Sequence, residues 1–148
     1  VFKYFEDLCK IPHGSGNMEK ISEYCVDFAK CHSLRYVCDK AKNVIIYKEA
    51  SKGFEMCEPI ILQAHLDMVA EKTSDSAFDF EKEPLDIFVD RDFIKAKNTT
   101  LGADNGIGVA IILAILSDRE LPHPPIEAVL TTDEEIGMIG AGELVFSL

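Results

Sequence analysis

Residues 59–68, PIILQAHLDM, restrict the possible folds more than any other part of the sequence. The apolar run 60–64 is typical of a short strand that is buried on both faces, in the middle of a parallel or mixed sheet. The run stops at His65 and Asp67, which point to the same side of an extended chain. Loops that leave the carboxyl ends of strands in open α/β sheets converge on a ligand site. We therefore expect a functional site here, although a hydrogen-bonded structural histidine is the alternative.

Residues 98–110, NTTLGADNGIGVA, form a second informative stretch. Three glycines surround Asp104 and Asn105, and the apolar residues that follow predict a helix over 107–116. Such a helix start is permissive and electropositive, so either side chain could simply cap the helix. A phosphate cradle is disfavoured, because no Gly-Lys-Ser/Thr follows and an aspartate stands where the phosphate would lie. A cation ligand suits Asp104 better.

Residues 126–131 predict another strand, and acidic residues follow it directly. Glu134 and Glu135 lie just past its carboxyl end, where they bind a cation or only complement the dipole of a following helix. His123 precedes the amino end of the same strand. We therefore exclude His123 from a site at the carboxyl ends.

Five residues are expected to share one crevice: His65, Asp67, Asp104, Glu134 and Glu135. Four carboxylates with one histidine, and with no Lys or Arg nearby in sequence, would repel each other and would cost several kcal/mol each if buried unpaired. One or two divalent cations remove that problem. Mixed imidazole and carboxylate ligands suit zinc, manganese or cobalt, and a spare carboxylate beside such a metal is the arrangement for hydrolysis.

The remaining pattern predicts one α/β domain, with a mixed central sheet and helices on both faces. A chain of 148 residues can bury one ordinary core. The expected helices span 1–11, 17–32 and 107–116; the expected strands span 34–38, 43–48, 60–64 and 126–131, with a hairpin at 85–89 and 93–96 and a surface segment at 72–84. The helix over 107–116 is apolar nearly all round, so it should pack between the sheet and another layer.

The composition excludes several partners. The net charge of −11 disfavours nucleic acid and anionic membranes, and the longest apolar run is too short to cross a bilayer. Five cysteines without a Cys-x-x-Cys pair indicate reduced core thiols rather than disulfides or a zinc ribbon. We expect a cytoplasmic protein that binds a small substrate. The start at Val1 leaves open where the natural chain begins.

Several motifs together resemble one enzyme family. AHLDMV, TTLGADNGIGVA, LPHPPIE and TTDEEIGMIGAG, with FEDLCKIPHGSGN near the amino terminus, are similar to the aminoacyl-histidine (Xaa-His) dipeptidases. These belong to the two-zinc exopeptidase superfamily, which includes aminoacylases and carnosinases. The His-Leu-Asp pattern is shared across the superfamily, whereas Asp-Asn-Gly with the His-Pro-Pro loop narrows the resemblance to this branch.

The resemblance implies a role for each candidate residue. His65 and Glu135 would each bind one of two metal ions, and Asp104 would bridge the two ions. The peptide bond between Asp104 and Asn105 would be cis. Asp67 would orient His65. Glu134 would be the general base. The expected cofactor is two divalent ions, with zinc first and manganese or cobalt as alternatives.

The resemblance also indicates that the matching proteins are longer than this sequence. The matching proteins supply another aspartate ligand shortly beyond residue 148, a final histidine ligand near their carboxyl end, and a lid domain. Residues 1–148 would thus be the N-terminal portion of a zinc-exopeptidase-like catalytic domain. We expect the longer protein to hydrolyse Xaa-His and other unblocked dipeptides, and this portion alone to be inactive. The alternatives are an N-acyl-amino-acid hydrolase or tripeptidase on the same metal centre, and a metal-free structural or interaction module.

Overall fold

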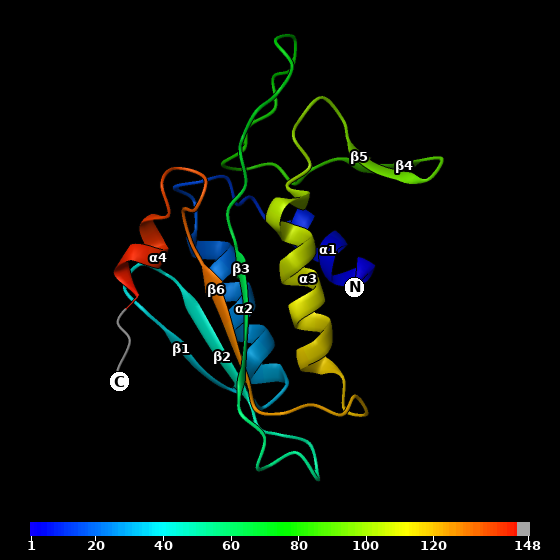
Figure 1. Cartoon of the computed structure of the whole chain (residues 1–148). Coiled ribbons are helices and arrows are strands. Elements are labelled where there is room, and N and C mark those ends of the chain that lie inside the picture. The colour runs from blue at the N-terminus through cyan, green and yellow to red at the C-terminus, as the bar shows by residue number, and fades with distance from the viewer. Residues whose placement is uncertain (145–148) are drawn as a thin grey trace.

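A computed structural model describes residues 1–144. In chain order its elements are α1 (Phe2–Cys9), α2 (Glu19–Cys31), β1 (Arg35–Cys38), β2 (Val44–Lys48), β3 (Ile60–His65), β4 (Ile87–Asp90), β5 (Phe93–Ala96), α3 (Ala103–Ser117), β6 (Ile126–Thr131) and α4 (Ile139–Glu143). Four strands form a sheet in the order β1-β2-β6-β3, and β4 and β5 form a separate hairpin that projects from the domain (Figure 1). The secondary structure follows the sequence pattern closely.

The register of the sheet brings two strand ends together. β3 and β6 run parallel, with Ala64 opposite Leu130 and His65 opposite Thr131. β2 runs antiparallel to both β1 and β6, so the sheet is mixed, as expected. Because β3 and β6 end at the same level, the segments that follow them leave the same edge of the sheet.

One face of the sheet carries the hydrophobic core. Val44, Ile46 and Leu130 on this face are fully buried. α2 packs against β1 and β2, α3 packs against β3, and α1 contacts α3, so α3 lies between the sheet and another helix, as predicted (Figure 1). The α/β class is thus confirmed.

The helical cover differs from the expectation of helices on both faces. Within residues 1–144 the three longer helices lie on one face, and the opposite face leaves Val37 and Ile61 exposed. Ile107 and Ile111 of α3 are also exposed. The apolar pattern of a helix predicts how much of its surface is buried. It does not predict which face of the sheet the helix will cover.

The expected burial of β3 on both faces is wrong for its first half. Ile60 is 41% exposed and Ile61 is 65% exposed, because β3 is an edge strand of the sheet formed by the described residues. β6 takes the central place instead. Only the end of β3, at Ala64 and His65, is buried. An apolar run predicts that a strand forms. Which strands lie beside it in the sheet depends on pairing between segments that are distant in the sequence.

The cysteine prediction holds in part. All five thiols are free, and Cys9 and Cys25 are buried core residues, but Cys31, Cys38 and Cys57 are exposed. None of the helices in the described part of the chain is both long and apolar enough to cross a membrane.

Candidate metal centre

His65 ends β3 with its side chain almost fully buried. Its Nδ1 lies 3.0 Å from the backbone carbonyl oxygen of Asp67 and 3.4 Å from a carboxylate oxygen of the same residue. Both partners can only accept, so Nδ1 carries the proton. In a neutral imidazole, Nε2 then presents its lone pair, which is the form that binds a metal.

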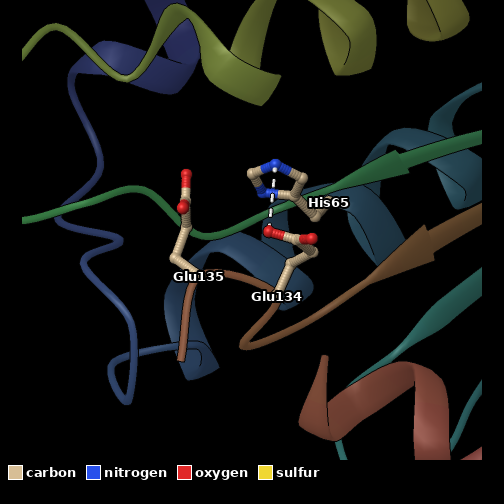
Figure 2. A group of neighbouring side chains, drawn as sticks. All are labelled: His65, Glu134 and Glu135. Carbon is tan, nitrogen blue, oxygen red and sulfur yellow. Dashed lines mark ion pairs between the residues drawn. The ribbon is translucent and has the colours of Figure 1, made fainter. Parts of the chain in front are cut away.

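Carboxylates surround that lone pair. Nε2 of His65 lies 3.1 Å from Oδ1 of Asp104 and 3.9 Å from Oε2 of Glu134. Figure 2 shows the side chains of Glu134 and Glu135 next to the imidazole, and one ligand atom from each of these three residues lies within 4.8 Å of the others. These atoms are all acceptors, and within residues 1–144 no Lys or Arg forms a salt bridge with them. This set of ligand atoms therefore fits a divalent cation.

Asp104 reaches this group from the start of α3. Gly102 before it has a φ of 70°, a left-handed conformation suited to glycine, and a side chain there would collide with Met68. The peptide bond between Asp104 and Asn105 is cis, as the resemblance implied. The side chain of Asp104 is 87% exposed, so it faces solvent above the buried histidine.

The turn after β6 carries both glutamates. Its backbone is fixed on one side by buried Asn43, whose side chain accepts from the Thr132 amide at 3.0 Å and donates to the Gly140 carbonyl at 2.8 Å. Asp133 has a φ of 53° and accepts a hydrogen bond from the amide of Gly16 at 2.7 Å. This turn precedes α4, so the glutamates stand in a turn rather than in the first turn of a helix.

The carboxylate of Asp67 contacts more groups than His65 alone. Asp67 is 1% exposed, and its carboxylate accepts from the backbone amides of Glu134 at 2.9 Å and Glu135 at 3.1 Å. The hydroxyl of Ser15 also donates to it, at 2.7 Å. Sequence reasoning missed Ser15. The only signal was a polar Ser-Gly-Asn loop directly after the first helix.

A cavity of about 370 Å³ adjoins the carboxylates. Asp104 and Glu135 line one part of it, and Val69 and Leu101 add apolar surface. His123 lies at the opposite end of β6, where it is buried, so it is separated from these carboxylates by the length of the strand. The structure thus brings His65, Asp104 and the glutamates together and places Asp67 beneath them.

Comparison with known proteins finds related peptidases. Over 137 residues the chain is 46% identical to the cytosol non-specific dipeptidase of Escherichia coli K12, a match that covers 93% of the chain and 28% of that protein. The crystal structure of aminoacylhistidine dipeptidase from Vibrio alginolyticus is similar with a TM-score of 0.94 and 43% identity, over 97% of this chain and 29% of that one. A tripeptidase from Staphylococcus aureus has a TM-score of 0.78 and 25% identity, over 97% of this chain and 38% of that one.

The sequence matches no family model. The chain spans less than a third of the length of the first two relatives.

Proposed function

Because the chain is homologous to a segment of the aminoacyl-histidine dipeptidases, as its motifs indicated, we propose that the protein containing it hydrolyses unblocked dipeptides, including those that end in histidine. The observation that carries this proposal is the set of acceptor atoms around Nε2 of His65. A divalent cation between these atoms would offset their mutual repulsion, and a cation beside a spare carboxylate is suited to hydrolysis.

We assign His65, Asp104 and Glu135 as the residues that would hold two divalent ions. Zinc is the expected metal, and manganese or cobalt are the alternatives, because the ligands combine imidazole and carboxylate groups. When bound, the metal makes water more acidic and polarises the peptide carbonyl.

We assign Glu134 as the general base. Its side chain is 38% exposed and stands 3.9 Å from the imidazole, so it borders the ligands and still reaches solvent. From this place it can take a proton from the attacking water and deliver it to the leaving amine. Asp67 acts as a positioning residue, because it holds His65 through its carbonyl group and the glutamate turn through its carboxylate. Glu134 and Glu135 thus have separate roles, which follow the resemblance of TTDEEIG to the family.

The Glu134→Gln substitution in the full-length protein tests this assignment. We expect kcat to fall by about 10²- to 10⁴-fold while metal content stays the same, because the amide cannot accept the proton. Glu135→Gln should instead lose metal. Turnover measured with metal analysis after dialysis distinguishes the two, and Glu143→Gln at the end of α4 is the matched control. A Glu134→Gln protein with undiminished turnover would contradict the assignment.

We further propose that residues 1–148 are the N-terminal portion of the catalytic domain and that this portion alone binds metal weakly and hydrolyses nothing. The support is the resemblance, which places two further ligands and the lid domain outside this sequence. The ligands present here would hold an ion with an incomplete set.

A tripeptidase is the second candidate, favoured by the similarity to the Staphylococcus aureus tripeptidase. The same metal ligands would serve either substrate, so the choice depends on the substrate groups that the protein accepts. A panel of free dipeptides, tripeptides and N-acetylated dipeptides separates the candidates. Preference for the free dipeptides would support the first proposal, and preference for tripeptides would replace it.

A further inference from the structure

The loop of residues 13–17, between α1 and α2, crosses the ends of both β3 and β6. It pairs with the chain that leaves β3 through two backbone hydrogen bonds of 3.2 Å with Met68. It also contacts the turn that leaves β6, because the amide of Gly16 donates to the Asp133 carboxylate at 2.7 Å. The loop therefore joins the segment that carries His65 to the turn that carries Glu134 and Glu135, two of the three segments that supply the proposed ligands and base.

The Ser15 hydroxyl extends this connection to the buried carboxylate beneath the site. It donates to Oδ2 of Asp67 at 2.7 Å, whereas the alternative acceptor, the Met68 carbonyl oxygen, is 3.5 Å away. Hydrogen bonds to a carboxylate are stronger than those between neutral groups. The amide of Glu135 shares Oδ2, and the amide of Glu134 occupies Oδ1. Three donors from two segments thus fix the orientation of one carboxylate.

We propose that Ser15 is a positioning residue of the metal centre, acting through Asp67 on the turn that presents Glu134 and Glu135. Without the hydroxyl, the hydrogen bonds that remain to the carboxylate among residues 1–144 come from the two backbone amides of the turn, beside His65 Nδ1 at 3.4 Å, and the carboxylate and the turn can then move together. The glutamates would meet the metal and the water less often in the productive geometry. This inference rests on the proposed function, since it concerns the same centre.

The test compares Ser15→Ala with Ser22→Ala in the full-length protein. Ser22 is a matched control, because its buried hydroxyl donates to the Lys42 carbonyl at 2.8 Å in a part of α2 outside the site. We expect Ser15→Ala to weaken cobalt(II) binding and to lower kcat by about tenfold each, with KM changed by less than about twofold. Cobalt titration followed by visible absorption reports the metal centre directly, without turnover.

The control and a conservative variant separate positioning from stability. Ser22→Ala should bind cobalt and turn over like the wild-type protein, and Ser15→Thr, which keeps the hydroxyl, should recover most of both properties. Far-ultraviolet circular dichroism checks that each variant is folded.

Three results would overturn the inference. These are a Ser15→Ala protein with wild-type cobalt affinity and kcat, a Ser22→Ala protein with the same losses as Ser15→Ala, or a Ser15→Thr protein as impaired as Ser15→Ala. If the wild-type protein neither binds cobalt nor cleaves dipeptides, the proposed function fails, and the inference fails with it. If the wild-type protein does both and Ser15→Ala matches it, only the inference fails.

Discussion

The Gly140→Ala substitution tests how tightly the glutamate turn is packed. A Cβ atom at Gly140 would overlap with the carbonyl and hydroxyl oxygens of Thr132 and would lie 2.5 Å from Oδ1 of Asn43, where ordinary contact begins at 3.4 Å. Thr132 contributes backbone to this contact, and Asn43 is buried and hydrogen-bonded to both sides of the turn. Neither neighbour is the free end of a flexible side chain.

Two costs add up and one gain offsets them. Overpacking costs about 1–3 kcal/mol, and separating the buried Asn43 from its partners costs about 1–3 kcal/mol. Alanine regains about 0.5–1 kcal/mol over glycine in a helix. We therefore expect Gly140→Ala to lower the free energy of unfolding by about 1–5 kcal/mol. Because the same turn carries Glu134 and Glu135, metal affinity should fall as well.

Gly142→Ala is the matched control, because a Cβ atom at Gly142 of α4 meets nothing within 4 Å. It should leave the free energy of unfolding unchanged or raise it by up to about 1 kcal/mol. Urea unfolding followed by circular dichroism is the suitable assay, because the chain has no tryptophan. Equal stability of Gly140→Ala and Gly142→Ala would refute the packing described for the turn.

Two further predictions concern the cysteines and the isolated chain. Burial raises the pKa of Cys9 to about 11 and of Cys25 to about 12, so both remain thiols as the pH rises from 7 to 9. A thiol reagent should label the three exposed cysteines of the folded protein and reach these two only after unfolding; early labelling of all five would contradict their burial. The purified 148-residue chain should show no chelator-sensitive dipeptide hydrolysis, and appreciable activity of that kind would refute the need for ligands outside it.

Local pattern was sufficient to predict most elements and the residues that gather at one edge. The apolar run of β6, followed at once by acids, and the run of β3, ending at His65, each point to a strand with chemistry at its carboxyl end. Parallel pairing of the two strands then brings both ends together. In open α/β sheets the loops at the carboxyl ends of the strands converge on one site. The meeting of the two strand ends could therefore be predicted without knowing which strands pair.

Long-range contacts were the part that could not be predicted. The place of β3 at the sheet edge depends on which strands pair, and an apolar sequence such as Ile60-Ile61 suits a central strand equally well. The contacts of the Asp67 carboxylate come from Ser15, 52 positions away, and from Glu134, 67 positions away. Sequence spacing linked Asp67 only to its near neighbour His65.

The position of β3 has a consequence for behaviour in solution. In the sheet formed by residues 1–144, one edge of β3 has no neighbouring strand, and Ile60 and Ile61 are exposed. An extended segment could pair with the backbone at this edge. Natural proteins usually shield such edges, since an uncovered one acts as a template for strand addition and self-association. Chain that covers this side in a longer protein would therefore contribute to solubility, and any strand that it adds parallel to β3 would end beside His65.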